Sequence, residues 1–357
     1  MTRIAVVGLG AMGRNHLRVL SELEGTELVA VCDLDRDTAA AAGRTYSVPH
    51  FSSWDEMFAG ERIDAVIMAV PTRFHLEAGL AALEHGLNVL VEKPIAANLD
   101  EGRRLVAAVA KAGRVLAVGH LERFNAAVRE LQRRVAAGEL GRLFQVQARR
   151  LGPFPARIRD VGVVIDLATH DLDVIGHIVN SQVQRLYAET EQRIHTEHED
   201  ILNALLKFES GVLGVLQVNW LTPTKIRELT VLGERGMFVC NYLTQELTYF
   251  NNADVLRGEE SRRQPRAVTE GESVTFPISP SEPLRVELEA FVAAVRGERP
   301  IEVDGEAGLR ALHLALALVR SASDSRVLRK EELGRLWAGE PLGIGPAKPR
   351  SPDRDDL

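Results

Sequence analysis

Short apolar runs alternate with amphipathic segments along the first 120 residues. The apolar runs are typical of strands buried on both faces of a parallel sheet, and they lie at 4–7, 27–32, 65–70, 88–91 and 115–118. The intervening segments carry the 3.6-residue period of helices, most clearly at 14–23, 75–85 and 99–112. The alternation predicts an α/β fold with a doubly wound parallel sheet.

The pattern changes after Phe124. Helices are expected at 125–137 and 163–179, with a half-exposed strand at 143–150. Further strands then follow without helices between them, at 183–191, 200–209, 211–220, 228–232, 236–241 and 246–251. Such a series predicts a large, open, mostly antiparallel sheet in an α+β domain, followed by helices at 283–296 and 305–323. We therefore expect domains at 1–122 and 123–330, and a disordered Pro-, Arg- and Asp-rich tail at 346–357.

A glycine-rich turn joins the first strand to the first helix, and it reads Gly8-Leu9-Gly10-Ala11-Met12-Gly13. In a dinucleotide-binding turn the first glycine permits a tight bend, the second lets the backbone approach a pyrophosphate, and the third lets helix and strand pack closely. The free N–H groups at the start of the helix are expected to face the phosphates, and Ala11 and Met12 of the turn are expected to bind the cofactor as well. The alternative is a turn that only tightens a βα unit.

An acidic residue at the end of the second strand argues for the dinucleotide. Asp33 lies twenty residues after Gly13, where a carboxylate accepts hydrogen bonds from an adenosine ribose. A carboxylate also repels a 2′-phosphate, so NAD is favoured over NADP. Arg36 lies three residues after Asp33 and is able to pair with a 2′-phosphate, which favours NADP.

Composition narrows the class of protein. The chain has 357 residues, of which 45% are hydrophobic and 26% charged, as in soluble globular proteins. A net charge of −7 argues against a nucleic-acid binder, and no apolar run is long enough for a membrane span. The two cysteines, Cys32 in a buried strand and Cys240, are too few for a disulfide framework. These features favour a cytoplasmic enzyme.

Two polar segments fall at the carboxyl ends of predicted parallel strands, the edge at which such sheets bind ligands. They are Pro71-Thr72 and Glu92-Lys93-Pro94. Lys93 at this edge is suited to hold a substrate hydroxyl and favour its alkoxide character. Taken alone, a surface lysine before a helix explains it equally well.

Asp166 and His170 lie four residues apart on a predicted helix and so share a face. Apolar neighbours indicate that this helix is largely buried. A carboxylate and an imidazole facing together form a base with its orienting partner. A satisfied structural pair is the alternative, and a metal site lacks a third ligand, so no metal is expected.

The glycine turn, Glu92-Lys93-Pro94 and the Asp166–His170 helix, in this order, resemble the Gfo/Idh/MocA family of sugar and polyol dehydrogenases. The segment Ala69-Val70-Pro71-Thr72-x-x-His75 resembles that family's segment beside the nicotinamide. The resemblance implies an N-terminal Rossmann domain that binds NAD, with Glu92 and Lys93 also at the cofactor. It further implies that Lys93 binds the reacting hydroxyl, that His170 is the general base, and that Asp166 is its partner or proton relay.

Three further segments resemble family members that act on nucleotide-activated amino sugars, namely 119–125, 160–167 and 219–227. A nucleotide sugar carries a diphosphate, which needs cationic donors, and those available are Arg157, Arg159, Lys225 and Arg227. Arg123 and Asn125 follow the last strand of the first domain, where a substrate would reach them. Trp220 is a candidate wall of the sugar pocket, although a core position explains it equally well.

Taken with these residues, the resemblance implies NAD-dependent oxidation of a sugar ring hydroxyl, and its closer segments imply the 3-hydroxyl of a UDP-N-acetylhexosamine. One alternative is the same chemistry on an inositol or free sugar. Another is a non-catalytic regulator that senses NAD or a sugar, which would need no proton acceptor. The only partners expected are the small-molecule substrate and further copies of the chain. A homo-dimer or homo-tetramer is expected because residues 212–216 leave both faces of the second sheet partly apolar.

Overall fold

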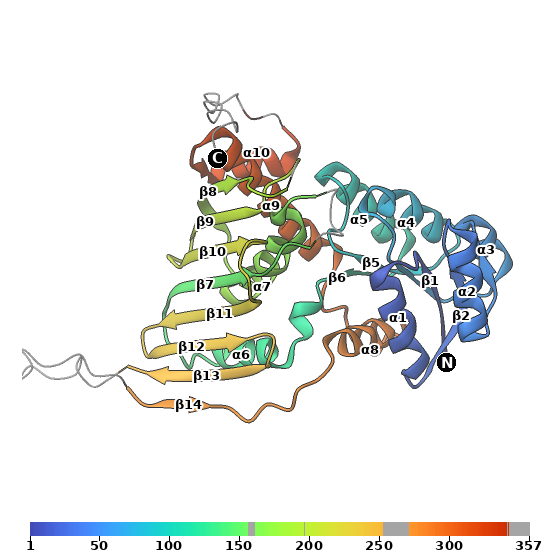
Figure 1. The fold of residues 1–357 in the computed structure, drawn as a ribbon, viewed down its shortest axis with the longest axis horizontal. Coiled ribbons are helices and arrows are strands. Elements are labelled where there is room, and N and C mark those ends of the chain that lie inside the picture. The colour runs from blue at the N-terminus through green and yellow to red at the C-terminus, as the bar shows by residue number, and fades with distance from the viewer. Residues whose placement is uncertain (156–160, 196, 253–270, 341, 343–357) are drawn as a thin grey trace, which may run out of the picture. The chain divides into compact units, whose positions relative to one another are not determined.

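The structure, a computed structural model, describes residues 1–155, 161–195, 197–252, 271–340 and 342 (Figure 1). The chain divides into two units, each with its own sheet. The first consists of Met1–Arg129 and Ser279–Leu312, and the second of Glu130–Ile278 and His313–Leu357.

The first unit contains a six-stranded parallel sheet in the order β3-β2-β1-β4-β5-β6, which is the order of a Rossmann sheet. Its strands are β1 (Thr2–Val7), β2 (Thr26–Cys32), β3 (His50–Phe51), β4 (Ala65–Met68), β5 (Asn88–Glu92) and β6 (Leu116–Gly119). Its connecting helices are α1 (Ala11–Glu22), α2 (Arg36–Tyr46), α3 (Trp54–Gly60), η1 (Thr72–Phe74), α4 (His75–Glu84), α5 (Leu99–Ala112) and η2 (Leu121–Phe124). The predicted doubly wound domain is confirmed.

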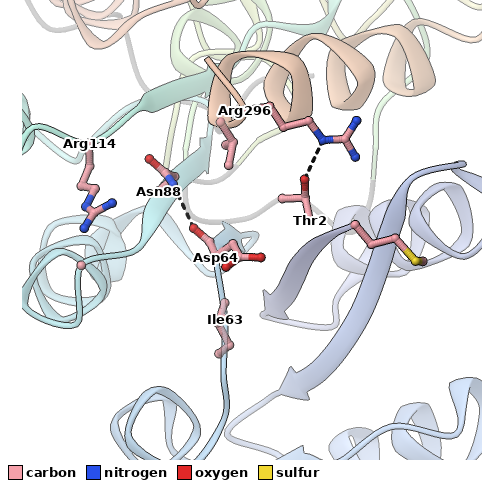
Figure 2. A pocket seen from close by; sticks show the side chains of 9 residues that line it. Thr2, Ile63, Asp64, Asn88, Arg114 and Arg296 are labelled. Carbon is pink, nitrogen blue, oxygen red and sulfur yellow. Dashed lines mark hydrogen bonds between the residues drawn. The ribbon is translucent and has the colours of Figure 1, made fainter. Parts of the chain in front are cut away.

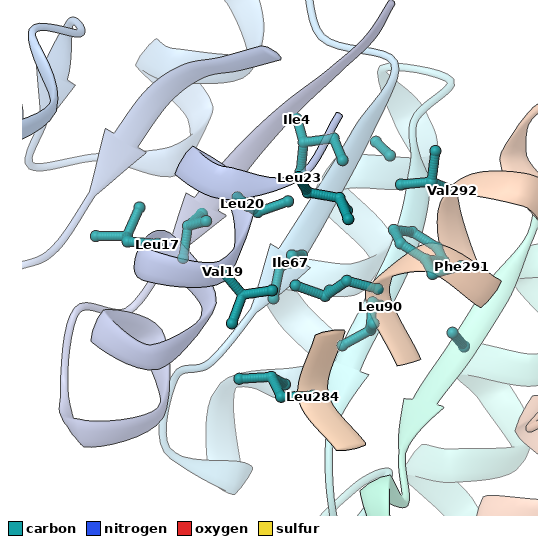
Figure 3. Packing of buried hydrophobic residues seen from close by; sticks show 14 of the residues in the cluster. Ile4, Leu17, Val19, Leu20, Leu23, Ile67, Leu90, Leu284, Phe291 and Val292 are labelled. Carbon is teal, nitrogen blue, oxygen red and sulfur yellow. The ribbon is translucent and has the colours of Figure 1, made fainter. Parts of the chain in front are cut away.

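A late helix, α8 (Pro283–Val295), completes the core of the first unit. Its Leu284, Leu288 and Phe291 join the buried cluster that contains Leu17 and Leu20 of α1 (Figure 3). This segment was predicted to belong to the second domain, but it lies in the first unit. The helical period shows that a segment has an apolar face, but it does not show which sheet that face will cover.

The second unit contains a nine-stranded sheet in the order β14-β13-β12-β11-β7-β10-β9-β8-β15. Its strands are β7 (Leu143–Leu151), β8 (Val183–Glu191), β9 (Ile201–Phe208), β10 (Leu213–Asn219), β11 (Ile226–Gly233), β12 (Gly236–Asn241), β13 (Glu246–Asn251), β14 (Ser273–Thr275) and β15 (Leu328–Arg329). Neighbouring strands are antiparallel except β7 and β10. The large antiparallel sheet predicted from the sequence is therefore confirmed.

Helices of the second part of the chain are α6 (Ala126–Ala136), η3 (Val164–Ala168), α7 (Thr169–Val179), α9 (Gly305–Asp324) and α10 (Lys330–Ala338). The helix predicted at 163–179 begins as the π-helical turn η3 and continues as α7. Within the second unit, α7 lies against β7 and η3 lies against β10. The predicted tail at 346–357 lies outside the described residues.

The two faces of the large sheet differ in exposure. On β10, Leu216 and Val218 are buried, whereas Leu213 on the other face is 47% exposed. Leu205 on the adjacent β9 is 58% exposed and lies opposite Val215 in the strand register. One face therefore carries the core, and the other presents apolar side chains at its surface.

Two expectations from composition are tested by the described residues. Cys32 and Cys240 are both buried and neither is in a disulfide, and burial together with the charge of Asp33 raises the pKa of the Cys32 thiol to about 12, which suits a core position. Within the part of the chain that the structure describes, no helix is both long and apolar enough to cross a membrane.

Candidate active site

The glycine turn between β1 and α1 has the geometry of a phosphate cradle. A side chain at Gly8, whose φ is +85°, would meet the Ala69 carbonyl oxygen at 2.5 Å, and one at Gly13 would meet the Gly8 carbonyl oxygen at 1.9 Å. A Cβ at Gly10 would meet nothing within 4 Å, so this side of the turn is open. Helix α1 begins at Ala11 without a side-chain cap, which leaves its first N–H groups to an anion. The turn therefore fits a dinucleotide pyrophosphate.

Asp33 is held against this turn by the main chain. Its Oδ2 accepts a hydrogen bond from the Leu9 N–H at 2.7 Å, and its Oδ1 accepts one from the Asp35 N–H at 2.9 Å. A carboxylate oxygen accepts more than one hydrogen bond. The same side chain is therefore oriented by the protein and retains acceptor capacity for a ribose diol.

We expect Asp33→Ala to narrow the preference for NAD over NADP, by up to about 1–3 kcal/mol, because a charged hydrogen-bond acceptor is removed. Asp33→Asn keeps a side-chain oxygen that accepts from the Leu9 N–H but removes the negative charge. Comparing the two variants therefore separates the effect of the charge from the effect of the turn geometry. Calorimetric titration with both dinucleotides measures the change. Asp35→Ala is the control, since Asp35 caps α2 by accepting from the Thr38 N–H. Tighter binding of NADP than NAD by the unmodified protein would contradict the role given to Asp33.

Glu92, at the end of β5, belongs to a buried set of titratable residues whose other members, His16 and Glu287, were not predicted from the sequence. His16 on α1 lies with its Nε2 2.7 Å from Oε1 of Glu92. Burial raises the pKa of Glu92, but the hydrogen bond from His16 and the charges of His16 and Lys93 outweigh it, so the pKa falls below its usual value. The Glu92 carboxylate therefore stays charged directly beside Lys93, which is half-buried.

Glu287 on α8 is the third member of this set. Burial, and then the charge of Glu92, raise its pKa well above the usual value, which favours the protonated acid. Among the described residues neither of its carboxyl oxygens has a hydrogen-bond partner. His16 and Glu287 are polar residues on the otherwise apolar face of a helix, and this sequence pattern would have identified them.

His75 links the ends of β4 and β5. Its two ring nitrogens each lie 3.0 Å from a carbonyl oxygen, one of Val70 and one of Pro94. Burial lowers the pKa of His75 and outweighs the hydrogen bonds to these carbonyls, so the imidazole is neutral and donates to one of them at a time. In this structure the ring braces the segment after Lys93, while Pro71 and Thr72 stand at the carboxyl end of β4 as predicted.

The predicted acid–base pair lies at the start of a buried helix in the second unit. Asp166 belongs to the π-helical turn η3, and His170, which is 9% exposed, lies in the first turn of α7. π-Helical turns inside helices occur frequently at functional sites. The next residue, Asp171, accepts from Nε of Arg150 at 2.8 Å and from its Nη2 at 3.1 Å, which ties α7 to β7 through a buried ion pair.

The residues predicted to bind substrate fall into different environments. Trp220 is 3% exposed and packs against Phe154 and His195, so the structure favours the core alternative for it. Asn125 is buried and its Oδ1 accepts from the Ala127 N–H at the start of α6. Lys225 is exposed.

Of the four arginines predicted to bind substrate, two lie in the part of the chain that the structure describes. Arg227 donates to the carbonyls of Leu151 and Ile226. Arg123 donates to the Glu302 carbonyl at 3.4 Å. Arg157 and Arg159 lie outside the described residues.

A depression on the first unit lies away from the predicted cofactor edge. Figure 2 shows it at the amino-terminal ends of β1 and β5, lined by Thr2, Asp64, Asn88, Arg114 and Arg296 among others. Asn88 donates to the Asp64 carbonyl and Nε of Arg296 donates to Oγ1 of Thr2, both at 2.9 Å. Because doubly wound sheets bind ligands at the carboxyl ends of their strands, we do not assign the cofactor to it.

The Rossmann sheet, its open glycine turn and Asp33 define a dinucleotide-binding domain. A family model described as "Oxidoreductase family, NAD-binding Rossmann fold" matches residues 2–120, and one described as "GFO/IDH/MocA C-terminal domain" matches residues 128–239. The chain therefore belongs to the Gfo/Idh/MocA family of oxidoreductases, and its cofactor is NAD.

Similar proteins extend over most of the chain. UDP-N-acetylglucosamine 3-dehydrogenase of Acidithiobacillus ferrooxidans is 27% identical over 88% of this chain and 95% of its own. Myo-inositol 2-dehydrogenase of Thermotoga maritima is 25% identical over 93% of this chain and 99% of its own. Among solved structures, the WlbA dehydrogenase of Bordetella pertussis in complex with NADH and UDP-GlcNAcA has a TM-score of 0.76 at 26% identity, covering 92% of this chain and 98% of its own.

Proposed function

We propose that the protein oxidises a ring hydroxyl of a sugar with NAD, and that its substrate is a UDP-N-acetylhexosamine oxidised at carbon 3. The observation that carries the proposal is the set of acid–base residues. Lys93 follows β5 at the cofactor edge of its sheet, and a buried helix presents Asp166 and His170 one turn apart. The names of the similar proteins supply the substrate class.

In the proposed mechanism NAD, when bound, supplies the acceptor for the hydride that leaves the ring carbon. The proton of the reacting hydroxyl passes to the imidazole of His170. Asp166 orients that imidazole and balances the charge it gains. The ammonium group of Lys93 stabilises the negative charge that develops on the hydroxyl oxygen. The Lys93 N–H donates to Oε2 of Glu92, and Nδ1 of His75 lies 3.0 Å from the Pro94 carbonyl oxygen, so both residues brace the main chain at Lys93.

A free inositol is the second candidate, and the similar myo-inositol and scyllo-inositol dehydrogenases support it. Cationic side chains near the end of β7 favour the nucleotide sugar instead. Side chains of both Lys225 and Arg227 approach within 4 Å of where a Cβ of Gly152 would stand. A diphosphate needs such donors and a polyol does not. A non-catalytic sensor of NAD or sugar fits least well, because it has no use for the acid–base set.

The test is NADH formation, followed by ultraviolet absorbance, with a panel of UDP-sugars, free sugars and inositols. We expect turnover with a UDP-N-acetylhexosamine. A thermal-shift screen with NAD present provides an independent readout, since a ligand at a hundred times its Kd stabilises by about 2.7 kcal/mol. Turnover with inositols alone would establish the second candidate, and stabilisation without turnover by any substrate would establish the sensor.

We propose further that the chain forms a homo-dimer or homo-tetramer through the exposed face of the second sheet. Leu205 and Leu213 on adjacent strands of that face are more than two-fifths exposed. Apolar side chains clustered at a surface favour association, and two-fold pairing of identical faces is the commonest solution.

Light scattering at micromolar concentration should therefore give a mass above the 39.2 kDa of one chain. Leu205→Glu combined with Leu213→Lys should lower that mass, because charges would be buried between the faces. The control is Leu34→Glu, since Leu34 is 67% exposed in the first unit. A clean monomer mass for the unmodified protein would end this proposal.

A further inference from the structure

The helix that carries Asp166 and His170 begins against a residue from a distant part of the chain. The Val163 N–H donates to the main-chain carbonyl of Glu199 at 2.9 Å. The Val164 N–H donates to Oε1 of the same residue at 3.2 Å. The first N–H groups of a helix have no partners within the helix, and here one residue satisfies two of them.

Glycine at position 162 makes room for this contact. A Cβ there would lie 2.0 Å from Oε1 of Glu199 and 2.2 Å from its carboxyl carbon. No side chain fits such a gap, so the Glu199 carboxylate occupies the space that a larger residue would fill. The Gly162 carbonyl also accepts from the Asp166 N–H at 3.0 Å, which places Asp166 directly on the turn that Glu199 holds.

The loop before Glu199 is itself organised around a buried carboxylate. Asp200 is fully buried and accepts N–H bonds from Arg193, Ile194 and His195, with distances between 2.6 and 3.0 Å. The Asp200 carbonyl in turn accepts from the Trp220 N–H at 3.0 Å. Glu199 therefore precedes a residue, Asp200, whose hydrogen bonds fix the main chain between β8 and β9.

We propose that Glu199 is a positioning residue for the acid–base pair, a role that rests on the proposed function. Its carboxylate satisfies the start of the helix, and its negative charge complements the positive end of the helix dipole. The turn it fixes contains Asp166 and leads into His170. Glu199 thereby sets where these two side chains stand without itself touching the substrate.

The primary test compares kcat and KM of Glu199→Ala and Glu199→Gln. We expect Glu199→Ala to lower kcat by about 10- to 10²-fold, since misplacement of a catalytic group by about 1 Å costs up to this much. Glu199→Gln should recover much of the loss, because its amide oxygen accepts from the Val164 N–H. Glu197→Ala is the control, since Glu197 lies in the same loop with an exposed side chain. The Kd of NAD should stay unchanged in all three.

A double-mutant cycle with Gly162→Ala tests whether Glu199 acts through its contact with Gly162. Alone, Gly162→Ala displaces the Glu199 carboxylate and should lower kcat to a similar degree. In the Glu199→Ala background the added methyl group has room, so Gly162→Ala should lower kcat little further. An equal cost of Gly162→Ala in both backgrounds, or full kcat in folded Glu199→Ala, would overturn the proposal.

Amide hydrogen exchange separates this proposal from the proposed function. Exchange at residues 163–168 should accelerate in Glu199→Ala and return toward the unmodified rate in Glu199→Gln, whatever the substrate. Unchanged exchange at those residues would refute the role of Glu199 even if the enzyme oxidises UDP-sugars. Faster exchange in a protein that oxidises no tested sugar would instead refute the proposed function alone.

Discussion

Replacing His170 by alanine should lower turnover by about 10²- to 10⁴-fold, the usual contribution of a positioned general base, while leaving the affinity for NAD unchanged. The hydroxyl proton must leave as the hydride does, and the substitution removes the imidazole that is proposed to accept it. Initial rates of NADH formation give kcat, and calorimetric titration gives the Kd of NAD. Lys93→Met should lower turnover in the same way, and Asp166→Asn should be comparably damaging or milder.

His177→Ala is the matched control, because His177 lies on the same helix with an exposed side chain. Circular dichroism of each variant establishes that the protein is folded. Near-normal turnover in folded His170→Ala would make the Asp166–His170 pair structural, and the proposed mechanism would be wrong.

Local signals were sufficient to predict most of the fold. The glycine turn, the apolar runs of β1, β4 and β5, and the alternating strands after Val183 are patterns within a few residues, and the physics that produces them is equally local. The structure confirms them with shifts of a few residues at element ends. It also adds short elements such as β3, whose two residues are too few to show a period.

Contacts between distant segments were not predictable in this way. Glu287 lies 195 positions after Glu92 in the sequence, yet the charge of Glu92 helps to raise its pKa. His16 meets Glu92 across 76 positions. A periodic pattern marks such residues only as polar groups on apolar faces, because the partner is decided by how the elements pack.

For the same reason, only some residues of the candidate site could be predicted from the sequence. Lys93, Asp166 and His170 stand out by their residue types and by the elements that hold them. Trp220 and Asn125 were named from position alone, and in the structure one packs in an aromatic cluster and the other caps a helix. Glu199 was missed because a glutamate in a loop between strands carries no signal until the helix start beside it is seen.

The buried pair of Arg150 and Asp171 should account for the largest loss of stability from a single substitution in the second unit. Their side chains are 4% and 2% exposed, and two hydrogen bonds join them. Arg150→Met leaves the Asp171 carboxylate buried without its ionic partner, which costs about 3–5 kcal/mol. The melting temperature should then fall by on the order of 10 °C.

Differential scanning calorimetry measures this loss, and Arg149→Met is the control, since the Arg149–Glu228 pair is more than three-tenths exposed. Exposed pairs contribute at most about 1 kcal/mol, so the control should melt near the unmodified protein. Combining Arg150→Met with Asp171→Leu should recover part of the stability, because no charge then remains buried. Since Asp171 follows His170 directly, turnover at a temperature where Arg150→Met is folded should also fall. Stability unchanged in Arg150→Met would show that β7 does not hold this helix through the ion pair.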